Sequence, residues 1–150
     1  MLGKLSDEEI EDLLNSQAIG RIGCHSDGIT YIVPVNYVYH NSIIYAHSAD
    51  GMKIAKMRKN PDVCFEVDCI KSMVSCQSVV AWGRFEEIED ITEKEDVLQK
   101  LKDKLMPLLN TETGSLWHGI TEHKNDIGTV APLVLYKIIL TWKNGRFERN

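Results

Sequence analysis

The stretch AIGRIGCHSDGITYIVPVNYVYHNSIIYAH, residues 18–47, decides the fold of this chain. Val, Ile and Tyr are frequent in it, and these residues favour β-strands. The strands that it predicts are residues 18–25, 29–40 and 42–47. Asp27-Gly28 and His40-Asn41 suit tight turns between them. Because strands joined by such short links pair antiparallel, the pattern indicates an antiparallel sheet or barrel.

The remainder of the chain extends this β pattern. Further strands are predicted at residues 62–70, 77–88 and 133–142. Residues 110–130 are polar and contain several glycines, so we expect a long loop there. Asn144-Gly145 indicates a turn after the last strand. The order of elements excludes a doubly wound parallel sheet and predicts a mainly β fold.

Three helices are expected at the periphery of the sheet. Ser6 and Glu9 form a capping box at the start of the first helix. A short basic helix is predicted from Met52 to before Asn60-Pro61. Thr92 is the predicted N-cap of the last helix, which carries an apolar stripe at helical spacing.

Composition limits the classes of protein that are possible. With 150 residues, 43% hydrophobic and 26% charged, the chain suits one globular domain, residues 1–150. The net charge of −5 argues against a general nucleic-acid binder. No apolar stretch suits a signal peptide or a membrane span, and the four cysteines form no C-x-x-C pair. We therefore expect a cytoplasmic protein with reduced thiols and no metal site.

An anion site is predicted where the strand ending in His47-Ser48 meets the basic helix. A hydroxyl at a strand end and the free N–H groups of a first helical turn both suit a phosphate. Lys53 also lies in that first turn, where a cation is unfavourable unless an anion is near. The alternative interpretation is that these polar residues merely end the strand. For Ser48 with Lys53 it is about as well supported as an anion site, and for His47 it is better supported than a functional role.

Two interrupted strands could border a flat ligand. Pro34 cannot donate to a β-ladder, so this part of its strand is expected at an edge or a bulge, and Asn36 adds an amide. Gly83, in the middle of another strand, permits close approach of a ligand or of another backbone, and Trp82 could cover an aromatic ring. The structural alternatives are an ordinary edge strand and a bulge with Trp82 in the core.

Taken together, these segments resemble the FMN-binding split-barrel superfamily of pyridoxamine 5′-phosphate oxidase, and most closely its small nitroimidazole-resistance (Nim) type. The resemblance covers residues 5–90 well and the last strand loosely. The segments that carry it are IGRIG (19–23), VPVNY (33–37), IYAHS (44–48) with GMK (51–53), NPDVCFEV (60–67) and SVVAWGR (78–84). It implies a six-stranded antiparallel split barrel that forms a homodimer with FMN at the subunit interface.

The resemblance also implies roles for particular residues. Met52 and Lys53 would hold the phosphate of FMN, and His47 would be the residue nearest the substrate. Trp82 and Gly83 would approach the flavin, from the partner subunit in one arrangement. The implied cofactor-binding residues are Pro34, Val35, Asn36, Tyr37, His47, Ser48, Met52, Lys53, Ser78, Trp82 and Gly83.

The activity implied is that of an FMN-dependent oxidoreductase with a small-molecule substrate, in which a donor reduces the flavin and the flavin reduces an acceptor such as a nitro group. The alternatives are a flavin-binding or storage module without activity, and a split barrel adapted to haem or a deazaflavin. Pyridoxamine phosphate oxidases end in an Arg-Leu-His-Asp-Arg type motif, whereas this chain ends WKNGRFERN without the histidine. Vitamin B6 oxidation is therefore not expected.

Overall fold

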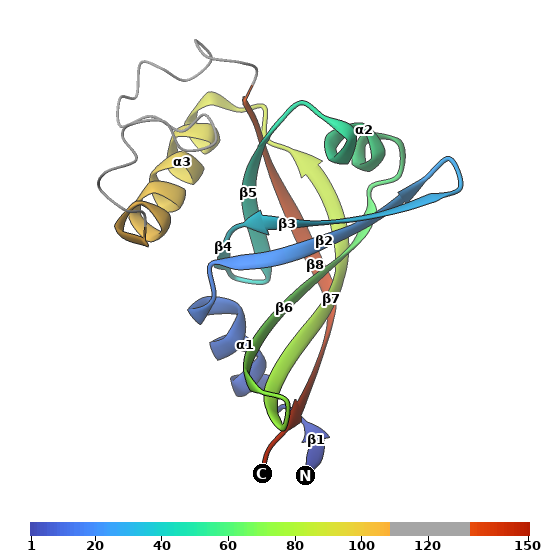
Figure 1. The fold of residues 1–150 in the computed structure, drawn as a ribbon. Helices are drawn as coiled ribbons and strands as arrows, with labels where there is room; N and C mark the ends of the chain where they lie inside the picture. Colours follow the sequence, from blue (N-terminus) through green and yellow to red (C-terminus); the bar gives the residue numbers. More distant parts are fainter. Residues whose placement is uncertain (109–132) are drawn as a thin grey trace.

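The computed structural model describes residues 1–108 and 133–150. The loop predicted at residues 110–130 lies outside the described residues. Figure 1 shows a strongly curled sheet with one helix near each end and a third helix at its side. The elements in chain order are β1 (Leu2–Lys4), α1 (Asp7–Ser16), β2 (Ile19–Ser26), β3 (Ile29–Asn36), β4 (Val38–His40), β5 (Ile43–Ala49), α2 (Met52–Lys59), β6 (Asp62–Ser72), β7 (Ser75–Glu87), α3 (Ile91–Leu105), a 3-10 turn (Met106–Leu108) and β8 (Leu133–Glu148).

The strands form one antiparallel sheet in the order β3-β2-β6-β7-β8-β5-β4, with β1 paired to β8. Among the described residues no ladder joins the two edges, β3 and β4, so the sheet curls without closing. This arrangement confirms the predicted split barrel. It has eight strands rather than six, because Tyr37 interrupts the predicted strand 29–40 and because β1 had not been predicted.

Local signals placed the first helix and the first hairpin correctly. Ser6 Oγ accepts a hydrogen bond from the Glu9 N–H at 3.2 Å, and the Glu9 carboxylate accepts one from the Ser6 N–H at 2.8 Å. This reciprocal pair is the predicted capping box. Asp27 and Gly28 have φ values of 54° and 76°, which is the left-handed turn that a two-residue hairpin requires.

Two predicted details of the helix and strand ends are wrong. The N-cap of α3 is Asp90, whose carboxylate accepts a hydrogen bond from the Glu93 N–H at 2.9 Å, and Thr92 lies inside the helix. β8 runs straight through Asn144-Gly145 without a turn. A Cβ on Gly145 would lie 2.8 Å from side-chain atoms of Leu5 and Ile10. This glycine therefore allows α1 to pack closely on β8.

Two hydrophobic clusters hold the elements together. The larger one fills the curled sheet, where the Tyr37 and Phe65 rings meet edge to face at 4.8 Å. α2 covers one end of it with Ile54 and Met57. The smaller cluster joins α3 to strands β4 and β8. No helix within residues 1–108 or 133–150 is long and apolar enough to cross a membrane.

Candidate functional site

The end of β5 presents two predicted site residues on opposite sides of the strand. Ser48 shares a face with Ile44 and Ala46, which belong to the larger cluster. Its hydroxyl donates a hydrogen bond to the Ala49 carbonyl at 2.8 Å. His47 is buried on the face that carries Tyr45, beside the smaller cluster. The structure therefore brings Ser48 to the start of α2 and turns His47 toward the α3 side.

Helix α2 starts without a negative charge. Its N-cap, Gly51, makes no side-chain cap, and the first turn contains no acidic residue. Lys53 is partly buried in this turn, and among the described residues no carboxylate lies within ion-pair distance of it. Burial lowers the pKa of Lys53, and the neighbouring Cys24 thiol opposes this shift. The free amides and the unpaired ammonium both suit an anion.

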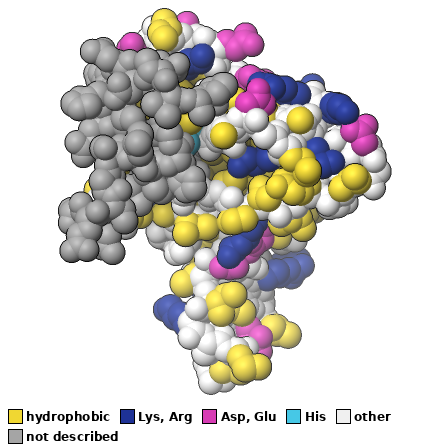
Figure 2. Space-filling view, turned by 45° about the horizontal axis from the view of Figure 1, so that its top comes forward, with side chains coloured by type: hydrophobic (Ala, Val, Ile, Leu, Met, Phe, Trp, Pro, Cys, Tyr) yellow, Lys and Arg dark blue, Asp and Glu magenta, His cyan; other side chains and the backbone are white. Residues whose placement is uncertain are grey.

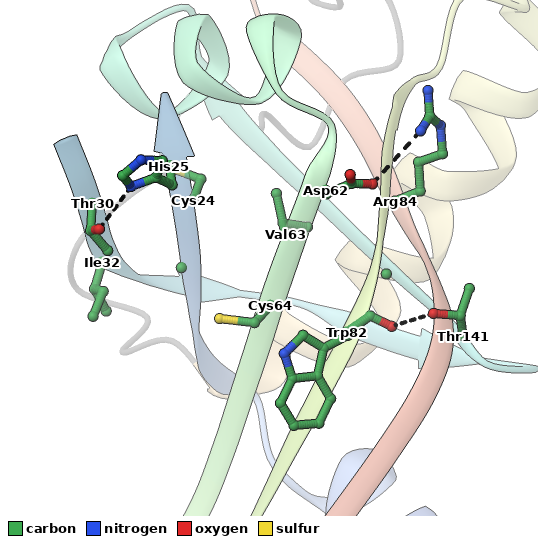
Figure 3. A pocket seen from close by; sticks show the side chains of 12 residues that line it. Cys24, His25, Thr30, Ile32, Asp62, Val63, Cys64, Trp82, Arg84 and Thr141 are labelled. Atoms are coloured by element: carbon green, nitrogen blue, oxygen red, sulfur yellow. Dashed lines mark hydrogen bonds and ion pairs between the residues drawn. The ribbon is translucent and has the colours of Figure 1, made fainter. Parts of the chain in front are cut away.

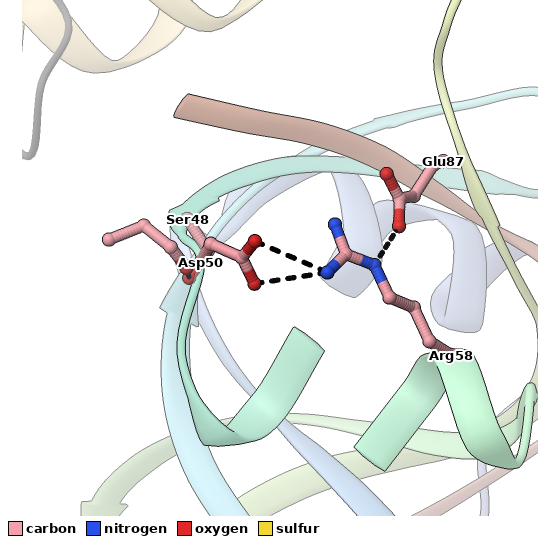
Figure 4. Close-up of polar contacts among 5 residues, drawn as sticks. Ser48, Asp50, Arg58 and Glu87 are labelled. Atoms are coloured by element: carbon pink, nitrogen blue, oxygen red, sulfur yellow. Dashed lines mark hydrogen bonds and ion pairs between the residues drawn. The ribbon is translucent and has the colours of Figure 1, made fainter. Parts of the chain in front are cut away.

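An ion-pair network holds the loop that leads into α2 (Figure 4). Arg58 Nη1 donates to the two carboxylate oxygens of Asp50 at 3.1 and 3.2 Å, and Arg58 Nε donates to Glu87. These hydrogen bonds to Glu87 and Asp50 raise the pKa of Arg58. The guanidinium thus neutralises Asp50, the carboxylate that lies next to the start of α2.

Strand β3 is an edge strand, as Pro34 predicts. Its hydrogen-bonded neighbour is β2, where Pro34 lies opposite Arg21. Val35 and Tyr37 point into the core, and the Tyr37 hydroxyl donates to the Leu14 carbonyl at 2.6 Å. The Val35 and Tyr37 side chains are therefore held in the core, while Pro34 and Asn36 stay accessible.

A continuous apolar row crosses the outer face of the sheet. The register pairs Gly23 with Ile32 and with Cys64, Cys64 with Trp82, and Trp82 with Trp142. The Trp82 and Trp142 rings stack with their centroids 4.5 Å apart. Trp82 is 37% exposed, Trp142 62% and Ile32 68%. This row and its surroundings form the outer face of the sheet.

A cavity of about 530 Å³ lies on the outer face, a volume suited to a small-molecule ligand. In Figure 3 the Cys64 sulfur and the Trp82 indole lie near the middle of the lining residues, with His25 and Thr30 on one side. Arg84 lies on the other side. Hydrophobic side chains also gather among Lys and Arg side chains on the side of the molecule with α2 and the β2–β3 hairpin (Figure 2).

Gly83 occupies a bulge. The register between β7 and β8 shifts between Trp82 and Gly83, and the hydroxyl of the extra residue, Thr141, donates to the Trp82 carbonyl at 3.2 Å. A Cβ on Gly83 would lie 2.4 Å from the Ile139 carbonyl oxygen. The glycine therefore serves close backbone packing, as the bulge alternative predicted. Trp82 itself is not in the core, contrary to the other half of that alternative.

Comparison with known proteins places the chain in a family. A family model described as pyridoxamine 5′-phosphate oxidase matches residues 6–122. The chain belongs to the pyridoxamine 5′-phosphate oxidase family. An uncharacterized protein of Rhizobium meliloti (RA0666) is 33% identical over 84 residues, which is 56% of this chain and 56% of that relative. The match thus spans little more than half the length of this curated relative.

Solved structures of similar proteins cover nearly the whole chain. A FAD-binding protein of Mesorhizobium loti is 29% identical, with a TM-score of 0.71 and 98% of each chain covered. A candidate 5-nitroimidazole antibiotic resistance protein of Bacteroides thetaiotaomicron is 22% identical, with a TM-score of 0.72 over 98% of this chain and 87% of that one. The FAD-binding protein of Mycobacterium smegmatis is 24% identical, with a TM-score of 0.68 over 99% and 100%. The last two likenesses show the fold.

One copy of this pyridoxamine 5′-phosphate oxidase family member does not bring all the predicted site residues together. Ser48, Met52 and Lys53 meet at the start of α2, whereas Trp82 and Gly83 lie on the outer face. Ser78 pairs with Asp68 and Arg146 near the chain ends, far along β7 from the α2 side (Figure 1). The predicted site is therefore divided between two regions of the protomer.

Several residues of these regions were not singled out by the sequence. Trp142 completes the outer row, but its partner depends on a register that includes a bulge. Lys56 and Ser26 are both buried where α2 packs on β2. The signal that could have indicated Lys56 is its spacing, because a residue three positions after Lys53 shares its helix face.

Proposed function

We propose that this protein binds FMN through its phosphate at the start of α2 and acts as an FMN-dependent oxidoreductase. The observation that carries the proposal is Lys53, a partly buried cation in a first helical turn that has no carboxylate near it in the described chain. A cation in this position is stabilised when an anion binds beside it. The similar protein of Mesorhizobium loti, which is described as FAD-binding, supports a flavin as the cofactor.

The residues around α2 fit a flavin phosphate. Lys53 and the first amides of α2 would donate to the phosphate oxygens, with the Ser48 hydroxyl and Met52 beside them. Pro34 and Asn36 would face the isoalloxazine ring along the free edge of β3. Val35 and Tyr37 would contribute backbone groups, since their side chains are buried. His47 is buried on the α3 side of β5, opposite to Ser48, and would border the substrate from that side.

A second copy of the chain would complete the site. Trp82 and Gly83 are separated from Lys53 within one protomer, and the outer face exposes an apolar row. Burying that row in a homodimer would be favourable, and would bring Trp82, Gly83 and Ser78 of one subunit toward the phosphate site of the other. This arrangement is supported by the division of the predicted residues between the two regions.

FMN, when bound, supplies hydride transfer between a reduced donor and an acceptor. The protein's part is to hold the phosphate at Lys53, to keep the ring against the edge of β3 and to exclude water with apolar side chains. We propose nitroaromatic compounds as the first acceptors to test, since a similar fold occurs in a candidate 5-nitroimidazole resistance protein. The chain carries no nicotinamide-binding glycine fingerprint, so the donor is to be found by assay.

The test is the absorption spectrum and mass identification of the cofactor in the purified protein. We expect a yellow protein that releases FMN. The bound flavin should be reduced by NADH or NADPH and reoxidised by a nitroaromatic compound. A flavin that undergoes neither reaction would favour a binding or storage module, and a Soret band would favour haem.

A further inference from the structure

The contact between α2 and β2 gathers four polar side chains beneath the helix. Lys53 and Lys56 are three residues apart and share one face of α2. Cys24 and Ser26 are two residues apart and both point inward from β2. Lys56 Nζ donates to the Ser26 carbonyl at 3.2 Å, which fixes these two elements against each other. These four residues form the double-lysine contact.

Lys56 is a buried cation without an ionic partner in the described chain. Only 7% of its surface is exposed, and among residues 1–108 and 133–150 no carboxylate lies within ion-pair distance. Lys59, on the next turn of the same helix, differs in both respects. It is exposed, and its Nζ lies 2.7 Å from an Asp27 carboxylate oxygen. The burial of Lys56 therefore does not follow from the basic character of α2.

Ser26 adds a second unsatisfied group to the same contact. This residue is 7% exposed, and its Oγ is buried with no hydrogen-bond partner among the described residues. A buried hydroxyl without a partner is costly, as is a buried ammonium without a counter-charge. Cys24 supplies no negative charge, because burial raises the pKa of its thiol. The double-lysine contact thus has two positive charges and one spare hydroxyl.

We propose that Lys56 is the second cation of the phosphate site and makes this site specific for a phosphate monoester, hence for FMN over FAD. The proposal rests on the proposed function, in which Lys53 holds the cofactor phosphate. A monoester has a second pKa of about 6 and carries nearly two negative charges at neutral pH. Each phosphate of FAD has one ester and one anhydride bond, so it has no second ionisable proton and carries one negative charge. Two lysines on one helix face match the dianion, and the Lys56 charge is little screened because it is buried.

The experiment compares Lys56→Met with Lys59→Met in the full chain after removal of bound flavin. FMN, FAD and riboflavin are titrated into each protein, with flavin fluorescence as the readout. Methionine keeps the apolar stem of lysine and removes its charge. We expect the wild-type protein to bind FMN at least about tenfold more tightly than FAD.

Lys56→Met should weaken FMN binding by about tenfold, FAD binding by less, and riboflavin binding not at all. Lys59→Met should change none of the three. The flavin-free Lys56→Met protein should melt at the same or a higher temperature than the wild type, because it no longer buries an uncompensated charge. Weaker FMN binding in an equally stable protein would separate a role in the phosphate site from a role in folding.

Two results would overturn the inference while leaving the proposed function intact. One is equal loss of FMN and riboflavin affinity in Lys56→Met, and the other is wild-type protein that binds FAD as tightly as FMN. A wild-type protein that binds no flavin would instead overturn the proposed function, and this inference with it.

Discussion

The double-lysine contact buries charge, whereas the outer face of the sheet exposes apolar rings. At the first, Lys53 and Lys56 lack a negative partner in the described chain. At the second, Trp82 and Trp142 stack on each other but remain open to solvent. The double-lysine contact lacks an anion, and the outer face lacks a molecule that shields its aromatic rings from solvent. In the proposed homodimer these regions of two subunits meet, and FMN, with a dianion at one end and a flat ring at the other, would fit between them.

Substitution of Lys53 is the most direct test of the need for an anion at the double-lysine contact. Lys53→Ala should weaken FMN binding by about 10- to 100-fold, because a charge-assisted hydrogen bond to the phosphate is lost. Fluorescence titration measures the affinity, and a far-UV circular dichroism spectrum checks that the fold is intact. Lys59→Ala is the matched control, since that lysine pairs with Asp27 at the surface. Unchanged FMN affinity in Lys53→Ala would remove the phosphate role.

A charge introduced on the outer face tests whether this apolar surface is buried in the proposed homodimer. Trp82→Asp should raise the dissociation constant of the proposed homodimer at least about 30-fold, as expected for loss of a buried aromatic anchor. Sedimentation velocity over a range of concentrations measures it. Met73→Asp is the control, because Met73 is 95% exposed at the tip of the β6–β7 hairpin, away from the apolar row. A wild-type protein that sediments as a monomer would contradict the proposed dimer.

Gly83 on the outer face and Gly51 at the start of α2 differ in how much room their surroundings leave for a side chain. Gly83→Ala should lower the free energy of unfolding by about 1–3 kcal/mol, because the new Cβ would lie 2.4 Å from the Ile139 carbonyl oxygen. Gly51→Ala should cost less than about 1 kcal/mol, because its Cβ meets its nearest neighbour at 4.0 Å. Urea denaturation measures both. Equal costs would show that the bulge in β7 adapts to a side chain.

Lys104 is partly buried like Lys53, but it has contacts with other residues. We expect its substitution to have the smallest effect of those considered. Lys104 Nζ lies 4.4 Å from the centre of the Tyr37 ring and donates to the Gln17 carbonyl at 2.5 Å. Burial lowers its pKa to about 8. Above that pH the unfolded chain keeps a proton that the folded protein has lost, so this group makes the protein more stable as pH rises toward the unfolded pKa of about 10.4.

Lys104→Met should remove this rise, which we expect to be about 1 kcal/mol or less after solvent screening. The measurement is urea denaturation at pH 7.5 and 9.5. Lys100→Met is the control on the same helix, since Lys100 pairs with Asp96. The Tyr37 hydroxyl does not interfere, because burial raises its pKa well above this range. A wild-type stability that falls between the two pH values would contradict the lowered pKa of Lys104.

The sequence predicted those features that depend on neighbours along the chain. The capping box at Ser6 and Glu9 and the turn at Asp27-Gly28 are local, and both are present. Lys53 could be singled out because a cation in a first turn conflicts with the helix dipole. Whether it binds FMN stays a prediction.

Features that depend on how elements pack could not be predicted in this way. The burial of Lys56 follows from the side of α2 that faces β2. The Tyr37 side chain fills the core and meets the Phe65 ring, which lies on a distant strand. The Trp82–Trp142 stack requires the β7–β8 register, which a bulge shifts. Such contacts are set by tertiary structure rather than by residue spacing.

The pairing of β1 with β8 has a practical consequence for handling the protein. Leu2 lies opposite Glu148, and the amino group of Met1 donates to the Arg149 carbonyl at 2.5 Å. Residues 1 and 150 thus lie at one end of the sheet, remote from α2 (Figure 1). An affinity tag or fluorophore fused at either residue would emerge away from the start of α2. A linker joining the two residues would also need to span only a short gap, so a circularly permuted chain opened at the Met73 hairpin is a feasible design.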